Sequence, residues 1–150
     1  MTLYEEFRTV LDALDRAAVD YALVGGLAVA VWGAPRATKD IDLLIRPEDV
    51  SRATSALAGS GFTLEGLPFQ FNDGTRVHRI NKVDAEGHLM TVDLMIVNES
   101  LESVWASRAR FPFADRDVAV VSREALIAMK ARAARPQDIA DIESLKDIDR

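Results

Sequence analysis

Two aspartates separated by a single residue, Asp40 and Asp42, are the side chains best placed to do chemistry in this sequence. They flank Ile41 and lead into the apolar residues 43–45, a pattern that predicts a β-strand. Both carboxylates then project from one face of the strand, with their α-carbons roughly 6.5 Å apart. This spacing suits two carboxylates that bind one divalent cation, or a pair of cations about 3.5–4 Å apart. A ligand set made only of oxygen favours a hard ion, Mg²⁺ or its substitute Mn²⁺, in a two-metal site.

A glycine pair, Gly25 and Gly26, lies upstream of these aspartates and is separated from them by residues 27–39. It follows residues 21–24, which predict a short buried strand, and precedes the apolar residues 27–32, which predict a short helix. The backbone amides of such a turn, together with the start of a helix, are suited to binding phosphate. Taken alone, the pair is more often an ordinary turn between a strand and a helix.

A third acid, Asp93, stands within residues 90–97, which are mostly apolar. A carboxylate inside a hydrophobic strand is costly unless a cation receives it. A strand next to the first two aspartates would bring Asp93 to the same metal site. The alternative is a structural ion pair with Arg36 or Lys130.

These parts, in this order, resemble the nucleotidyltransferase superfamily that includes DNA polymerase beta. Its signature is a strand that ends in a glycine pair, a helix, a spacer of similar length, an Asp-x-Asp strand and a further acid. Residues 25–28 and 36–43 look most like the AbiEii-type toxin nucleotidyltransferases and related bacterial proteins. Residues 126–130 and 135–142 are similar to the second conserved block of that group. The resemblance extends over residues 21–145.

The resemblance implies the α/β (α+β) nucleotidyltransferase fold, a mixed β-sheet flanked by helices. It also implies magnesium-dependent transfer of a nucleoside monophosphate from a nucleoside triphosphate, such as ATP, to an acceptor hydroxyl. Asp40, Asp42 and Asp93 would be both the catalytic residues and the metal ligands. Asp138 and Asp141 would orient the last helices. The residues that the resemblance assigns to nucleotide binding are Gly25, Gly26, Arg36, Thr38 and Lys130.

The acceptor and the biological setting stay open at this point. An RNA end, a protein hydroxyl and a small molecule are all candidate acceptors, and a toxin–antitoxin system is the setting that the resemblance implies. One alternative is a non-catalytic member of the fold that binds a nucleotide or a partner protein. Another is an antitoxin-like enzyme that nucleotidylates a partner protein. Small antibiotic nucleotidyltransferases usually carry a tryptophan and an acid in the helix after the glycine pair, and the sequence of residues 27–32, which end in Trp32 and contain no acid, argues against drug modification.

The site residues also have simpler structural explanations. An Asp-x-Asp pattern is what the solvent face of an edge strand looks like. Lys130 alone is ordinary helix surface, and Arg135, Asp138 and Asp141 would form a set of charges between two helices. Because all of these residues occur together in the order of the signature, the enzyme is the favoured interpretation.

The elements that must position these residues form a single α/β domain over residues 1–150. The first helix opens with a capping box made by Thr2 and Glu5. The expected helices are residues 3–18, 27–32, 46–58, 123–134 and 136–148, and the expected strands are residues 21–24, 41–45, 62–65, 76–82, 90–97 and 118–121.

Composition bounds the class of protein. The 150 residues are 49% hydrophobic and 28% charged, as in a globular domain. The lack of cysteine excludes disulfides and thiolate metal sites and agrees with a cytoplasmic protein, and no apolar run approaches membrane-spanning length. The net charge of −6 argues against a protein that coats nucleic acid. A surface covered by a second copy of the chain or by a protein partner is predicted from loop-like segments that contain Phe69, Phe71, Phe111 and Phe113.

Overall fold

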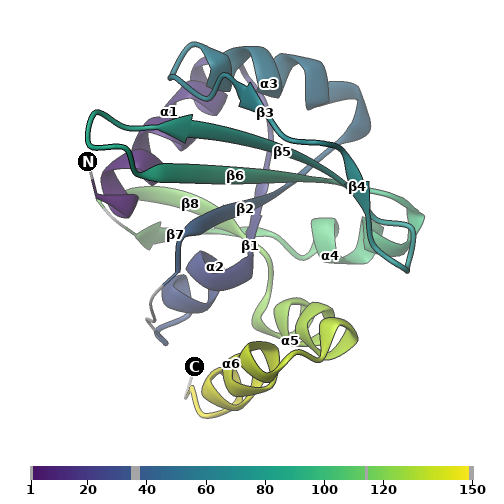
Figure 1. Ribbon diagram of the computed structural model, residues 1–150. Helices are drawn as coiled ribbons and strands as arrows, with labels where there is room; N and C mark the ends of the chain where they lie inside the picture. Colours follow the sequence, from purple (N-terminus) through teal and green to yellow (C-terminus); the bar gives the residue numbers. More distant parts are fainter. Residues whose placement is uncertain (1, 35–37, 114, 149–150) are drawn as a thin grey trace.

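A mixed β-sheet forms the centre of the computed structural model, which describes residues 2–34, 38–113 and 115–148 (Figure 1). Its strands are β1 (Ala22–Val24), β2 (Asp40–Ile45), β3 (Leu64–Glu65), β4 (Phe69–Gln70), β5 (Arg76–Val83), β6 (Leu89–Ile96), β7 (Ala109–Phe113) and β8 (Arg116–Val120). Their order across the sheet is β3-β5-β6-β2-β1-β8-β7, and β4 also pairs with β5. The parallel neighbours are β2 with β6 and β1 with β8, so the predicted mixed sheet is confirmed.

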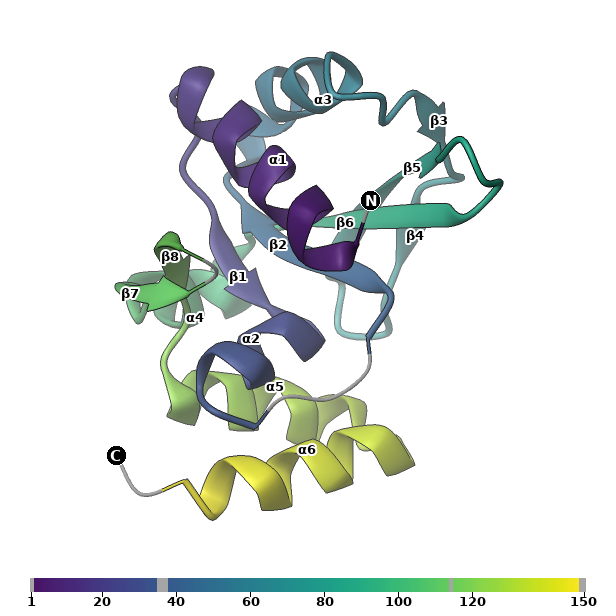
Figure 2. The same cartoon turned by 90° about the vertical axis from the view of Figure 1, so that its left-hand side faces the viewer.

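Helices cover the sheet on two sides. They are α1 (Leu3–Arg16), α2 (Gly25–Val31), α3 (Val50–Ala58), α4 (Glu102–Ala106), α5 (Arg123–Ala133) and α6 (Pro136–Lys146), with single 3₁₀ turns η1 (Pro47–Asp49) and η2 (Glu99–Leu101). Helices α1 and α3 pack together on one side, and α5 and α6 pack together on the other (Figures 1 and 2). Helix α2 contacts both β2 and α5 (Figure 2). Within the described ranges, no helix is long and apolar enough to cross a membrane.

The predicted capping box starts α1. The Thr2 amide donates to Glu5 Oε2 at 2.9 Å, and the Glu5 amide donates to Thr2 Oγ1 at 3.2 Å. Phe7, Leu11 and Leu14 then recur on one face of the helix, and all three are fully buried. The polar start and the apolar stripe together explain why this segment is a helix and which face meets the core.

Two short strands, β4 and β7, lie where the sequence analysis predicted loops. In β7, Pro112 resembles a strand breaker, but proline is tolerated on an edge strand, and β7 is the edge of the described sheet. Phe111 and Phe113 belong to β7 and pack against the core, so the prediction that these two residues lie in loop-like segments is wrong, while a surface covered by a partner stays a prediction. The strand predicted over residues 62–65 is reduced to its last two residues.

The two faces of β2 and β6 differ in character. Ile41 and Leu43 of β2, with Val92 and Leu94 of β6, are at most 1% exposed and belong to the hydrophobic core. Because side chains alternate between faces along a strand, the residues between them point the other way. That second face carries the acids.

Candidate active site

The register of the sheet brings the three predicted acids to one place. Strands β2 and β6 run parallel, with Asp42 opposite Asp93 and Asp40 opposite Thr91. Residues directly opposite each other in a sheet share a face, so all three carboxylates project from the same side. The adjacent strand predicted for Asp93 is thus present.

An arginine on the next strand holds Asp93. Arg79 of β5 lies opposite Asp93, and it donates from Nε to Oδ1 at 2.7 Å and from Nη2 to Oδ2 at 2.9 Å. Asp93 itself is 7% exposed. The ion pair that the sequence analysis considered for Asp93 therefore forms with Arg79, whereas Lys130 is engaged elsewhere and Arg36 lies outside the described residues.

Sequence reasoning missed Arg79, although a signal for it existed. Val83 pairs with Leu89 on either side of the β5–β6 turn, and the antiparallel ladder then counts back to Arg79 opposite Asp93. The turn-forming residues Asp84 and Gly87 mark the hairpin, and the register follows once Val83 is paired with Leu89. Arg79 also lies 5.2 Å from the centroid of the Phe69 ring, a cation–π contact with β4.

Crowded negative charge is the main electrostatic feature of this face. Burial, followed by the charges of Asp93 and Asp40, raises the pKa of Asp42 to about 7, against the opposing effects of Lys130 and Arg79. Burial and the charge of Asp93 also raise the pKa of Asp40. In the arrangement seen, the described residues contain no group of three acids or histidines that would hold a metal ion. Arg79 binds both oxygens of Asp93 in this arrangement.

Gly25, the first residue of the glycine pair, lies directly against the side chain of Asp42. Gly25 has a φ of +73°, and a Cβ built on it would lie 2.1 Å from Asp42 Oδ2 and 2.9 Å from the Asp42 Cβ and Cγ. A side chain at this position is therefore excluded both by the backbone and by the carboxylate. Gly26 is buried in the first turn of α2. The turn thus brings the chain backbone directly against one of the three acids.

Lys130 lies at the centre of a buried set of charges between α5 and α6. It is 6% exposed, and its Nζ is 2.8 Å from Asp141 Oδ2 and 3.8 Å from Asp138 Oδ1. Arg135 binds Asp138 from Nε at 2.7 Å, and Gln137 donates to Asp141 at 3.0 Å. This is the interhelical charge set weighed in the sequence analysis. Lys130 influences the acids from here, as its effect on the pKa of Asp42 indicates.

The remaining predicted nucleotide-binding residues lie before β2. Thr38 is half-buried, two residues ahead of Asp40. Arg36 falls outside the described residues. Of the predicted site residues, Gly25, Asp40, Asp42 and Asp93 therefore lie together. Arg79 joins them through its ion pair with Asp93, whereas Lys130 pairs with acids of α6.

Comparison with known proteins gives the family of the chain. Residues 1–147 match the protein family described as "Uncharacterised nucleotidyltransferase". The chain belongs to this nucleotidyltransferase family. The predicted superfamily is thus confirmed, while a particular closeness to AbiEii-type toxins stays a prediction. No curated protein matches the sequence.

Solved structures share the fold of this nucleotidyltransferase. The lincosamide antibiotic adenylyltransferase LnuA, solved with lincomycin bound, has a TM-score of 0.66 and 19% identity over 99% of both chains. ANT(2")-Ia, solved in complex with adenylyl-2"-tobramycin, has a TM-score of 0.67 and 17% identity over 97% of this chain and 88% of that chain. TM1012 from Thermotoga maritima has a TM-score of 0.67 and 16% identity over 93% and 89%. At these identities the likeness is one of fold.

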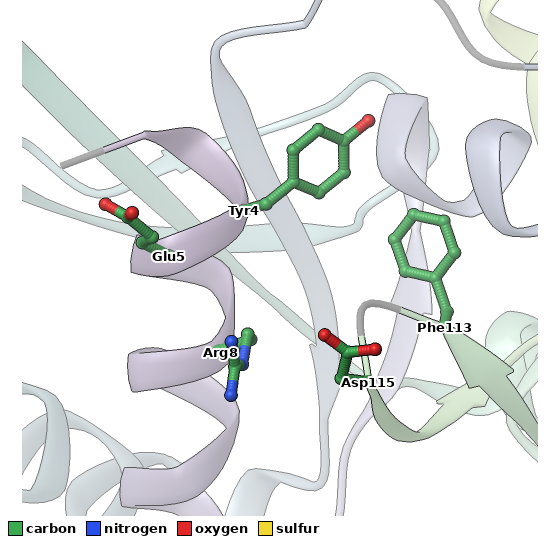
Figure 3. A pocket seen from close by; sticks show the side chains of 5 residues that line it. All are labelled: Tyr4, Glu5, Arg8, Phe113 and Asp115. Atoms are coloured by element: carbon green, nitrogen blue, oxygen red, sulfur yellow. The ribbon is translucent and has the colours of Figure 1, made fainter.

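A shallow pocket elsewhere on the nucleotidyltransferase does not coincide with the acids. It has a volume of about 290 Å³ and lies between the start of α1 and the β7–β8 turn (Figure 3). Tyr4 and Phe113 form its apolar wall, with ring centroids 5.9 Å apart. None of the predicted site residues that the structure describes lines this pocket. The sheet face that carries Asp42 and Asp93 is therefore the better candidate.

Proposed function

We propose that this nucleotidyltransferase moves a nucleoside monophosphate from a nucleoside triphosphate, ATP among them, to an acceptor hydroxyl, with Mg²⁺ as cofactor and Mn²⁺ as substitute. Family membership supports nucleotidyl transfer in general. The observation that supports the specific site is the pairing of Asp42 with Asp93 across β2 and β6, with Asp40 on the same face. The proposed setting is a toxin–antitoxin or related bacterial system. The acceptor is an RNA end, a protein hydroxyl or a small molecule.

The donor set fits divalent cations. Asp40, Asp42 and Asp93 supply only carboxylate oxygens, the ligands that a hard cation prefers. Burial, followed by the like charges of Asp93 and Asp40, raises the pKa of Asp42, and a bound cation would relieve that repulsion. When bound, the metal ions would stabilise negative charge on the attacking and leaving oxygens of the phosphoryl transfer.

The other residues would place the triphosphate. Gly25 lacks the side chain that would collide with Asp42, so the backbone of the turn lies directly beside this acid. Gly26 and Thr38 flank this place from α2 and from the segment before β2. Lys130 adds positive potential near Asp42 while bound to α6, and Arg36 is proposed from the motif alone. Positioning of two substrates is the main task of such a site.

A label-transfer experiment tests the proposed function. The protein is incubated with each labelled nucleoside triphosphate, Mg²⁺ and a cell extract, and the nucleic acid, protein and small-molecule fractions are counted. We expect one fraction to acquire label with the natural chain and to lose it with Asp40→Asn and with Asp42→Asn. Asp20→Asn, which changes an exposed acid away from the sheet face, is the matched control and should transfer normally. Transfer that survives both site variants would reject the assignment.

A second candidate is nucleotide binding without transfer. The observation that favours it is the engagement of both Asp93 oxygens by Arg79, which leaves the third acid committed to an ion pair. In that case a triphosphate should raise the melting temperature by mass action, while no fraction acquires label. The same set of samples therefore separates the two candidates.

A further inference from the structure

The partners of Arg79 differ from those of the other buried ion pair near the site. The Arg79 side chain is 42% exposed, whereas its partner Asp93 is almost fully buried. Its contacts are the two oxygens of Asp93 and the ring of Phe69, 5.2 Å from the guanidinium carbon. The Arg79 side chain is therefore already in contact with solvent and with an aromatic ring while it binds Asp93. Lys130, with both carboxylate partners in the interior, has no such exposure.

The ion pair with Arg79 competes with the proposed role of Asp93, which is to bind a cation together with Asp40 and Asp42. Both oxygens of Asp93 meet the guanidinium of Arg79, which already supplies the positive charge that this carboxylate needs. A guanidinium and a divalent cation that share the carboxylate of Asp93 repel each other, so a cation that Asp93 binds together with Asp40 and Asp42 weakens the bonds of Asp93 to Arg79. Because Arg79 is partly solvated and rests on Phe69, its release leaves no buried charge without compensation.

We propose that Arg79 is a positioning residue that serves as the counter-ion of the metal-free site. It holds Asp93 in place until a divalent cation takes over that carboxylate, and it then turns outward along the Phe69 ring. This inference rests on the proposed function, since it requires that Asp93 be a metal ligand. Arg79 and the cation compete for one carboxylate, so by linkage the removal of the guanidinium strengthens metal binding.

The direction in which Mn²⁺ affinity changes when Arg79 is removed distinguishes a competing counter-ion from a residue that supports metal binding. Arginine that merely orients a ligand from behind supports metal binding, and loss of such a partner weakens metal affinity by about 10–100-fold. A competing counter-ion predicts the reverse. For Arg79→Met we expect Mn²⁺ binding to become tighter, within the range of about 5–150-fold typical of coupled equilibria. In chelator, the same variant should melt at a lower temperature than the natural chain, because Asp93 has lost its cation.

The experiment is an isothermal titration of Mn²⁺ into the full chain, with melting curves in chelator and in saturating Mn²⁺. Arg76→Met is the matched control, since Arg76 is an exposed arginine of the same strand whose side chain points to the other face. It should change neither quantity appreciably. Unchanged or weaker Mn²⁺ binding in Arg79→Met would overturn the proposal, and a natural chain that binds no Mn²⁺ would overturn the proposed function together with it.

A second variant and a spectroscopic signal test the proposal even if Arg79→Met folds poorly. Arg79→Lys keeps the positive charge but cannot donate to both Asp93 oxygens, so its Mn²⁺ affinity should fall between those of the natural chain and Arg79→Met. In nuclear magnetic resonance spectra of the natural chain, the Arg79 Nε–H signal should move as diamagnetic Mg²⁺ is added, and the signals of arginines elsewhere should not. An Arg79 Nε–H signal that stays in place at saturating Mg²⁺ would show that the pair with Asp93 persists, against the proposal.

Discussion

Replacement of Gly25 by alanine is the sharpest test of how the turn and the acids are fitted together. The φ of +73° lies in the left-handed region, which disfavours an L-residue by about 1–2 kcal/mol. The new Cβ would lie 2.1 Å from Asp42 Oδ2, so either the turn or Asp42 has to move. Overpacking of this kind typically costs about 1–3 kcal/mol. Together the two effects should lower the free energy of unfolding by about 2–5 kcal/mol.

The matched control is Gly74→Ala. Gly74 has a comparable φ of +91°, but nothing lies within 4 Å of a Cβ built there. It should therefore show only the backbone effect, a loss of about 1–2 kcal/mol. Urea denaturation followed by circular dichroism measures both variants against the natural chain. Divalent-dependent triphosphate binding should be lost in Gly25→Ala, since either Asp42 or the turn beside it is displaced, and retained in Gly74→Ala.

Equal losses of stability in the two variants would refute the reasoning, because the contact with Asp42 would then have no energetic weight. The double variant Gly25→Ala with Asp42→Ala adds a check. It removes the Asp42 oxygen and Cγ that overlap with the new methyl group, so part of the lost stability should return. Strictly additive losses would contradict the steric explanation.

Two further predictions concern charge. In the metal-free protein, the pKa of Asp42 is raised from 3.8 to about 7, so the folded state binds this proton more tightly than the unfolded state does. In chelator, the free energy of unfolding should therefore fall by up to about 4 kcal/mol as the pH rises from about 4 to about 7. Asp42→Asn should abolish this part of the pH dependence in parallel denaturation curves, and an identical pH profile in the variant would contradict it. Lys130→Met should destabilise the fold by about 3–5 kcal/mol, because the buried carboxylates of Asp138 and Asp141 lose their shared cation. Arg132→Met on the exposed side of the same helix should stay within about 0.5 kcal/mol of the natural chain, and similar losses in both would contradict the buried charge set.

The local patterns of the sequence were sufficient for most elements and for the three acids. The capping box at Thr2 and the apolar stripe of α1 involve residues three or four positions apart, and such short-range signals survive in any tertiary context. The face shared by Asp40 and Asp42 also follows from the strand period alone. The pairing of β2 with β6 was inferred only from the chemical need of Asp93 for a neighbour.

Long-range pairing explains what was missed. The partner of Asp93 depends on the register of β5 against β6, and the sequence analysis did not extend the ladder from the turn to Arg79. Strand β7 was missed because Pro112 argues against a strand in the interior of a sheet. Proline is tolerated on an edge strand, and the edge position of β7 follows only from the topology of the whole sheet. The burial of Lys130 depends on how α5 meets α6, which the weakly amphipathic sequences of those helices do not specify.

The alternation of acids and core residues along β2 has a consequence for how the sheet selects its own alignment. If β2 were threaded one residue out of step, Asp40 and Asp42 would turn toward the interior and Ile41 and Leu43 toward water. Burying two carboxylates among aliphatic side chains is far costlier than losing one hydrogen bond, so misaligned sheets are rejected during folding. The same argument applies to Asp93 on β6. The acids of the proposed site thus also help to fix the alignment of the strands, and neutralising them should widen the range of sheets that the chain can form.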